Sequence, residues 1–210
     1  GITHRYWYNE MLNYKHYMLP GILGILVAAI GFVLAGLNMV KEKEAGTIEQ
    51  INVTPVRKYQ FVTAKMVPFL VIGLIDLAIG LAVGKLLFDI PFEGSIMLLF
   101  LCSAIFLVAA LGLALFVSTM SGTQQQFMFV AFFFMIIFIL MSGLFTPVDT
   151  MPRWAQIIDW FNPLKYFVEV IRMIMLKGSG FYDVLENLLI LLFYGAAALS
   201  VVVWQYKKVA

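Results

Sequence analysis

The sequence predicts an all-α integral membrane protein with about five transmembrane helices, and three observations support this fold class. The 210 residues are 62% hydrophobic and 12% charged, whereas soluble domains average about 45–50% apolar and about 25% charged residues. The mean hydropathy is +0.94, and the apolar residues gather into long, uninterrupted runs. This composition excludes a soluble globular enzyme, a disordered chain and a small disulfide-stapled module.

Each run has the length that a transmembrane helix needs, about 20 residues. The predicted spans lie at about 19–40, 66–88, 96–117, 127–145 and 185–204. Barrel strands would alternate polar and apolar residues, whereas these runs are continuously apolar, so helices remain as the way to satisfy the backbone in lipid. Residues 19–210 are therefore expected to form one transmembrane domain.

Lysine and arginine residues set the predicted orientation. An odd number of spans puts the two chain ends on opposite sides of the membrane, and positive residues favour the cytoplasmic side. Both sides carry similar numbers, but one set lies in shorter and denser groups: Lys41, Lys43, Arg57, Lys58, Lys65, Lys207 and Lys208. We therefore expect this side to be cytoplasmic and residues 1–18 to lie outside.

Residues 1–18 are expected to be the remnant of a preceding extracytoplasmic domain. The chain opens with Gly1 rather than Met, and no signal peptide precedes the aromatic stretch 5–9 that could carry it outward. We therefore expect this sequence to be the C-terminal part of a longer protein.

The loop between the first two spans predicts a short helix at about 47–53, held across the cytoplasmic surface. Gly46 can end the incoming helix, and Thr47 with Gln50 forms a capping box that begins a new one. Pro55 then fits the first turn of the next helix. The shape suits an element that docks a partner, and the alternative is an ordinary connecting loop.

Two amphipathic helices are predicted between the fourth and fifth spans, at about 151–161 and 163–176. The first gathers aromatic and aliphatic residues on one face, and the second opposes an apolar face to one with Lys165, Glu169 and Arg172. Both are too short or too charged to span the membrane. We expect them to lie in, or re-enter, the outer interface, as a lid or as a packing flap.

The chain shows no phosphate-binding loop of its own. The nearest approach, Gly80–Leu86, lacks the spacing and the hydroxyl of that motif, and with Gly73 it fits a small-residue stripe for helix packing. We therefore expect no ATPase site, bound cofactor or metal, and a net charge of +2 gives no case for a nucleic-acid partner. The glutamine triplet 124–126 is expected to be a solvated turn.

Asp76 is the one carboxylate deep inside a predicted span. Intramembrane ionisable residues are costly and often serve as ion or proton relays. The alternative is that Asp76 bonds to a neighbouring helix or faces a water-filled cavity. An ion-coupled carrier would usually need more than one such group, and the other spans offer none.

The segment 42–57 resembles the coupling-helix segment of ABC-2 type transporter permeases. The family pattern of an acidic residue, Gly-Thr, Glu and Pro is matched by Glu44, Gly46, Thr47, Glu49 and Pro55, with Gln50 and Arg57 in the same segment. The resemblance implies that these residues couple the membrane domain to an ATPase.

The outer loop resembles the same family a second time. Its match to the re-entrant region before the family's last helix includes Pro147, Met151, Pro152, Pro163, Tyr166 and Arg172. The stretch 5–9 is similar to the exit from the large outer domain of the drug-export branch. The ordered set of matches covers nearly the whole chain.

The resemblance implies a six-span permease with an outer domain between its first two spans, so the spans here would be the second to the sixth. It implies a multi-pass protein of the bacterial inner membrane, embedded in the lipid bilayer and paired with a second permease copy. A separate cytoplasmic ABC ATPase would bind ATP and Mg, and a periplasmic adaptor protein would also fit.

The implied function is export of a hydrophobic or amphipathic substrate, drug-like or lipid-like. Two alternatives come from other classes of protein. One is an ion-coupled secondary carrier that uses Asp76, and the other is a non-transporting membrane anchor or assembly protein.

Overall fold

A computed structural model describes residues 14–46, 58–90, 92–145, 148 and 151–205. In these residues the regular structure is helical, without β-strands. Five helices are long and apolar enough to cross a membrane: Tyr17–Glu44, Tyr59–Phe88, Ile96–Met120, Gln124–Met141 and Phe181–Gln205. The predicted fold class is confirmed, while the coupling helix expected at about 47–53 lies outside the described residues.

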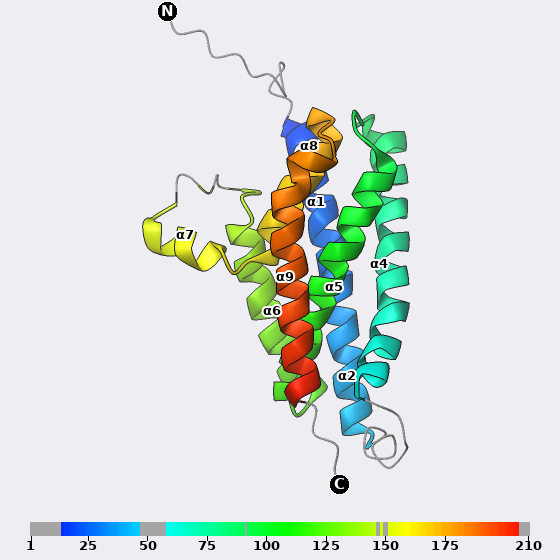
Figure 1. The fold of residues 1–210 in the computed structure, drawn as a ribbon, viewed down its shortest axis with the longest axis vertical. Coiled ribbons are helices and arrows are strands. Elements are labelled where there is room, and N and C mark those ends of the chain that lie inside the picture. The colour runs from blue at the N-terminus through cyan, green and yellow to red at the C-terminus, as the bar shows by residue number, and fades with distance from the viewer. Residues whose placement is uncertain (1–13, 47–57, 91, 146–147, 149–150, 206–210) are drawn as a thin grey trace, which may run out of the picture.

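The first span is a continuous rod of α1 (Tyr14–Ala29), the π-helical turn η1 (Ile30–Leu34) and α2 (Ala35–Glu44). The next spans are α4 (Lys58–Phe88), α5 (Ile96–Met120) and α6 (Gln124–Met141). Two shorter helices, α7 (Arg153–Asp159) and α8 (Pro163–Lys177), precede the last span, α9 (Phe181–Gln205). Neighbouring spans run in opposite directions, so α1 begins at the end of the bundle where α4 finishes (Figure 1).

Among the helix boundaries that differ from those of the predicted spans, two have a clear physical reason. α4 begins at Lys58, well before the apolar run at 66, because a helix can continue into polar residues beyond the hydrocarbon. α6 ends at Met141 although apolar residues continue to 145. Gly143 adopts a φ of 73°, the left-handed conformation that ends helices, and hydropathy does not register it.

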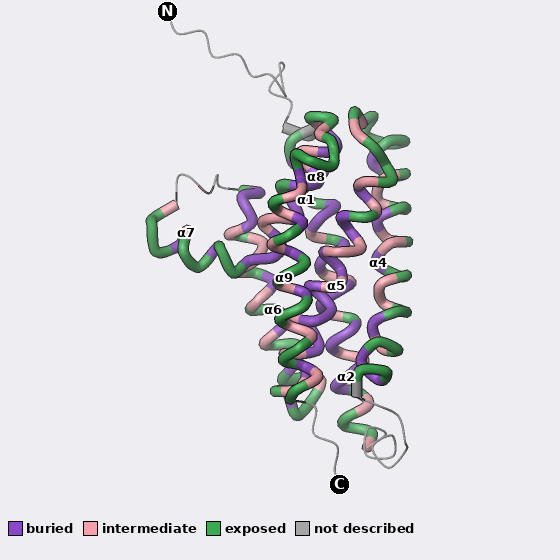
Figure 2. The backbone as a smooth tube through the Cα atoms, in the orientation of Figure 1, coloured by how far each residue is buried: buried purple, intermediate pink, exposed green. Residues whose placement is uncertain are grey.

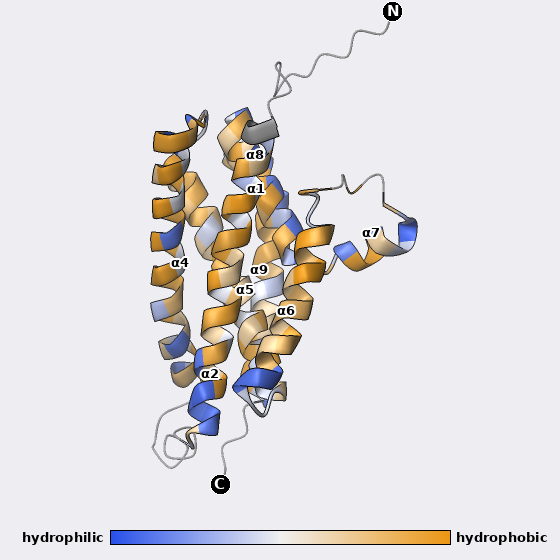
Figure 3. Ribbon diagram, turned by 180° about the vertical axis from the view of Figure 1, so that it is seen from behind, coloured by the Kyte–Doolittle hydropathy of each residue, from blue (hydrophilic) through white to orange (hydrophobic). Residues whose placement is uncertain are grey.

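α5 is the centre of the bundle. It contacts the first span, α4, α8 and α9, and its buried side chains include Leu99, Phe106, Leu107 and Leu111. α4 stands at one edge, with α6 and α7 at the other (Figure 1), and Figure 2 shows that α4 is largely exposed. The exposed part of α4 is mostly apolar (Figure 3), which suits a surface that faces lipid.

Glycines allow the closest helix contacts. A Cβ atom placed on Gly36 of α2 would overlap the buried ring of Phe127 on α6. The same atom on Gly31 or Gly73 would lie 2.9 Å or 2.7 Å from the side chain of Leu107 on α5. Helices gain no hydrophobic free energy by associating in lipid, so close packing through small residues provides much of the free energy of their association.

α8 re-enters the bundle instead of lying on its surface. α6 ends part-way along the bundle, α7 projects sideways, and α8 runs back beside α1, α5 and α9 (Figure 1). Phe167 of α8 stacks on Phe106 of α5 with ring centroids 3.9 Å apart, and both rings are buried. Of the two predicted outer helices, α8 is thus a packed element, whereas α7 exposes Trp154 and Ile157.

Gly36→Ala should lower the thermal stability of the purified protein in detergent, because the added methyl group overlaps the ring of Phe127. Overpacking of this kind costs about 1–3 kcal/mol. Thermal unfolding measures the loss, with Gly122→Ala at an exposed turn as the control. Adding Phe127→Leu should restore part of the stability, and an unchanged unfolding temperature for Gly36→Ala would contradict this packing.

Candidate functional site

Three consecutive charged residues, Glu42, Lys43 and Glu44, bind the end of α2 to its neighbours, and this group is termed the α2 clamp. Lys43 Nζ donates hydrogen bonds to the carbonyl oxygens of Thr119 and Ser121, at 3.2 and 2.8 Å. These carbonyls lie at the C-terminal end of α5, where carbonyl groups lack helical partners and positive charge is favourable. Lys43 therefore caps α5 from a different helix.

Glu44 contacts α6, the helix that follows α5 along the chain. One carboxylate oxygen accepts a hydrogen bond from the backbone N–H of Gln124 at 2.9 Å, and the other accepts from the side-chain amide of the same residue. Gln124 is the first residue of α6. The carboxylate thus lies at a helix N-terminus, where unpaired N–H groups and the helix dipole favour negative charge.

The turn between α5 and α6 has a cap of its own. Thr123 accepts from the backbone N–H of Gln126 at 3.2 Å, and the Gln126 side chain accepts from the backbone N–H of Gly122 at 2.8 Å. The arrangement resembles a capping box, except that the Gln126 side chain binds the N–H of the residue before the N-cap rather than that of the N-cap itself. The triplet 124–126 is therefore a structured helix start, and the expectation of a solvated turn is wrong.

Two further polar contacts complete this end of the bundle. Glu42 pairs with Lys65 of α4, and the Thr119 hydroxyl donates to the side-chain oxygen of Gln205 in α9 at 2.8 Å. The end of α2 is thus bound to α4, α5 and α6, and α5 is bound to α9. A displacement of the α2 clamp would be passed directly to three other spans.

The α2 clamp stands immediately before the segment that resembles a coupling helix. α2 ends at Glu44, and Gly46 follows with a φ of 71°, as expected of a glycine that ends a helix. The structure therefore places the exposed side chain of Glu44 against the start of α6. The other residues of the matched segment lie outside the described part of the chain: Thr47, Glu49, Gln50, Pro55 and Arg57.

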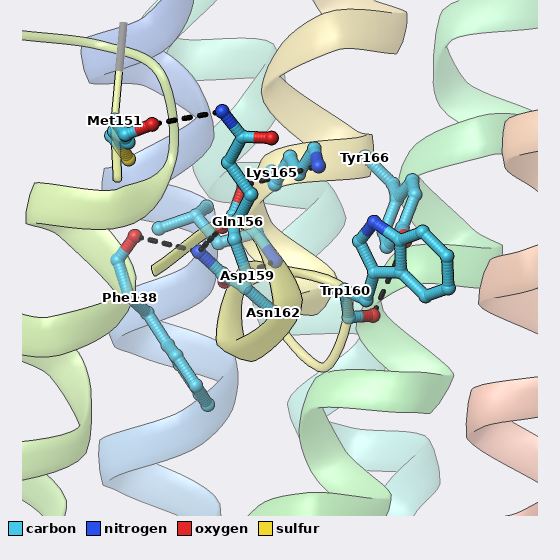
Figure 4. Close-up of polar contacts among 9 residues, drawn as sticks. Phe138, Met151, Gln156, Asp159, Trp160, Asn162, Lys165 and Tyr166 are labelled. Atoms are coloured by element: carbon cyan, nitrogen blue, oxygen red, sulfur yellow. Dashed lines mark hydrogen bonds and ion pairs between the residues drawn. The ribbon is translucent and has the colours of Figure 1, made fainter. Parts of the chain in front are cut away.

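A second polar cluster holds the turn between α7 and α8 (Figure 4). Asp159 is fully buried, and its Oδ2 lies 3.1 Å from Nζ of Lys165 in an ion pair. Asn162 donates to Asp159 Oδ1 at 3.2 Å and to the carbonyl oxygen of Phe138 at 3.0 Å. It also accepts from the N–H of Leu164 at 3.1 Å, which caps α8. Asp159 Oδ1 thus accepts a hydrogen bond, whereas Oδ2 has the ion pair with Lys165 but no hydrogen-bond partner in the described residues.

Two residues of the outer loop that resembles the family lie on either side of α7: Met151 precedes this helix, and Tyr166 follows it in α8. The Tyr166 hydroxyl donates to the carbonyl oxygen of Trp160 at 3.2 Å, and the Gln156 side chain donates to that of Met151 at 2.8 Å (Figure 4). Both contacts satisfy backbone carbonyls in the loops. They fix the path of the chain around α7, and neither side chain lies in a catalytic arrangement.

Two prolines of the outer loop that resembles the family lie at the starts of helices. Pro152 is the residue before α7, and Pro163 is the first residue of α8. The first turn of a helix tolerates proline because its N–H groups have no helical partner. Pro147 lies outside the described residues.

Arg172 of α8 joins three elements at the end of the bundle opposite the α2 clamp. Its guanidinium lies 3.9 Å from the centre of the Tyr17 ring in α1, and Nη1 donates to the carbonyl oxygen of Gly143 at 3.1 Å. Burial lowers the pKa of this guanidinium, although arginine stays protonated in proteins. Arg172 thereby connects α8, α1 and the end of α6.

Asp76 stands apart from both polar clusters. It is half-buried in α4, and its Oδ2 is buried without a hydrogen-bond partner in the described part of the chain. Gly73 and Gly80, one turn away on either side, face Leu107 and Leu23. In the residues that the structure describes, no group of three or more His, Cys, Asp or Glu side chains could hold a metal ion.

Sequence reasoning missed Lys43, Gln124, Asp159 and Lys165. The spacing of Thr123 and Gln126 was a readable capping signal for the start of α6. The contacts of Lys43 with Ser121 and of Glu44 with Gln124 could not be predicted from sequence, because about 80 residues separate the two partners of each contact. Nothing in the sequence indicated that Asp159 would be buried, since a charged residue is normally expected to be exposed.

The comparisons with known proteins agree with this architecture. Residues 2–204 match the model of the ABC-2 family transporter protein family. The chain is 33% identical over 183 residues to the probable multidrug ABC transporter permease YbhR of Escherichia coli K12, covering 87% of this chain and 50% of that protein.

Two other relatives come from the same organism. The probable multidrug ABC transporter permease YbhS is 28% identical over 189 residues, covering 90% of this chain and 50% of that protein. The inner membrane transport permease YhhJ is 28% identical over 192 residues, which cover 90% of this chain and 51% of that protein. This chain thus spans about half the length of these relatives.

Glu44→Ala should loosen the start of α6, because the N–H of Gln124 loses its acceptor. Loss of a helix cap favours fraying of the first turn, so the local amides should exchange several-fold faster. Hydrogen–deuterium exchange over 122–128 measures this in the purified protein. Lys41→Ala, at an exposed residue one turn earlier, is the control. Equal protection in both variants would mean that Glu44 does not cap α6.

Proposed function

This chain belongs to the ABC-2 family of transporter proteins, and from that premise we propose that it is the membrane-spanning permease part of an ATP-driven exporter. The α2 clamp carries the proposal, since it binds the residues next to the coupling-like segment to three other spans. A force applied at 47–53 would reach α4, α5 and α6 through direct polar contacts.

The energy source of this exporter would be a separate cytoplasmic ABC ATPase that binds ATP and Mg. Membership of the family implies such a partner, and usually a second permease copy as well. The sequence 80–86 lacks the spacing of a phosphate-binding loop, which supports a transport role without catalysis in this chain. The inner membrane of a bacterium is the proposed location.

The proposed mechanism is alternating access driven by the partner. Closure of the ATPase dimer would push on the segment 47–53, with Glu49 and Arg57 as charges that meet the partner. The helix restart at Pro55 would carry the shift into α4, and the α2 clamp would carry it into α5 and α6. The substrate would be hydrophobic or amphipathic, such as a drug or a lipid. A periplasmic adaptor is a further proposed partner.

Glu49→Ala should uncouple transport from ATP hydrolysis without affecting membrane insertion, because it removes a proposed contact charge. Coupling free energies are typically 1–3 kcal/mol, so ATP-driven transport should fall about five-fold or more. The assay uses the full-length protein and its co-purified ATPase in liposomes. Glu93→Ala, the same change at an exposed residue of the opposite end, is the control. Normal coupling in Glu49→Ala would overturn the assignment of the segment.

A second candidate function, an ion-coupled carrier, is favoured by the unpartnered Oδ2 of Asp76. A carrier of this kind predicts substrate flux that persists without ATP and stops in Asp76→Asn. Flux in the same liposomes, driven by an ion gradient alone, measures it. We expect Asp76→Asn to leave ATP-driven transport within two-fold of the parent, which is about 0.4 kcal/mol. Gradient-driven flux that Asp76→Asn abolishes would replace the exporter with a carrier.

A further inference from the structure

A cavity of about 760 Å³ lies between α1 and α4, at the end of the bundle opposite the α2 clamp. The facing helices contribute Leu19, Ile22, Leu23 and Leu26 from α1 and residues 80–86 from α4. Its volume falls in the range of about 300–1,000 Å³ that is typical of ligand sites. We term it the α1–α4 groove.

The α1–α4 groove opens sideways toward lipid. Several of its lining side chains are exposed, including Ile22 at 43%, Leu26 at 49% and Val83 at 43%. These side chains are aliphatic, and they belong to helices that are apolar enough to cross the membrane. The groove therefore presents an apolar trough along the hydrocarbon part of the bilayer, into which an acyl chain could lie.

Lys85 is the only charged residue among the described residues that line the groove. It lies three residues before the outer end of α4, and it is exposed, without an ion pair or hydrogen bond to any described residue. The nearby carboxylates in sequence, Asp89 and Glu93, are exposed and do not pair with it. A lysine near a helix end extends its ammonium group to the depth of the lipid headgroups.

We propose that the α1–α4 groove binds an anionic phospholipid of the outer leaflet, with an acyl chain in the trough and the phosphate on Lys85. The charge complementarity supports this occupant: an unpaired cation at headgroup depth stands over an aliphatic trough that continues into the hydrocarbon. A neutral lipid would fill the trough but leave the cation without its partner. This lipid is a resident ligand, and its binding does not rest on the transport reaction.

Lys85→Gln should weaken the binding of phosphatidylglycerol by about five-fold, because one lysine near the membrane surface contributes about 1 kcal/mol. Binding of diacylglycerol, which has acyl chains but no phosphate, should not change. Native mass spectrometry of the full-length protein, titrated with each lipid in detergent, measures both affinities. Lys41→Gln is the matched control, since Lys41 is also an exposed lysine and lies at the opposite end of the first span. An equal loss in both variants would mean general charge attraction and would overturn the site.

A second variant tests the trough itself. Ala82 lines the groove from α4 and is exposed, so Ala82→Phe should weaken the binding of both lipids without affecting the core. The same spectra report the fraction of dimer. A lower dimer fraction with unchanged lipid binding would show that a second copy covers the groove, which would overturn the proposal. Retained phosphatidylglycerol binding in Glu49→Ala would separate this site from the coupling of transport.

Discussion

Inside a bilayer no water is available to bind free backbone N–H and C=O groups, and some polar side chains of this bundle are placed to meet that constraint. Lys43 and Glu44 are exposed, so their hydrogen bonds to α5 and α6 join helices at the end of the bundle and do not answer this constraint. Where α6 stops part-way along the bundle, Asn162 and Arg172 donate hydrogen bonds to the carbonyl oxygens of Phe138 and Gly143. The interruption of the membrane-crossing path between α6 and α8 is tolerated because protein groups, rather than lipid, surround these carbonyls.

The first span links the two polar ends mechanically. α2 finishes in the α2 clamp, and α1 packs on α8 near the contact of Tyr17 with Arg172. Between them, η1 replaces the regular α-helical hydrogen bonds, a feature that is frequent at functional sites. Gly31 of η1 faces Leu107, the same side chain that Gly73 of α4 faces. A shift at the α2 clamp could therefore be transmitted along the first span to the contact of Tyr17 with Arg172, or to the contact of three helices at Leu107.

The sequence predicted the membrane-crossing helices because long apolar runs leave the backbone a single solution in lipid. It could not predict where α6 ends, because the left-handed conformation of Gly143 terminates a helix that hydropathy continues. It also left the character of the outer helices open, since an amphipathic face can meet lipid or protein. The stacking of Phe167 on Phe106 decides this for α8. The clamp partners meet only in the folded bundle, so composition and spacing could not pair them.

Exposure of apolar side chains carries little information in such a bundle, because lipid receives them as readily as protein does. Figure 3 shows apolar residues along most of α4, and their exposure needs no partner to explain it. The informative residues are the exceptions, a carboxylate at Asp76 and an ammonium group at Lys85, which lie nine residues apart on this helix. Asp76 has an oxygen that is buried without a hydrogen-bond partner in the described residues, whereas Lys85 is exposed and lines the α1–α4 groove. A buried carboxylate oxygen without a hydrogen-bond partner is energetically unfavourable, so Asp76 points to a function or to a neighbouring group outside the described residues. An exposed lysine beside a groove, by contrast, is free to bind a ligand. On the same helix, Asp76 is thus the residue on which the alternative of an ion-coupled carrier depends, and Lys85 is the residue on which the proposed lipid site depends.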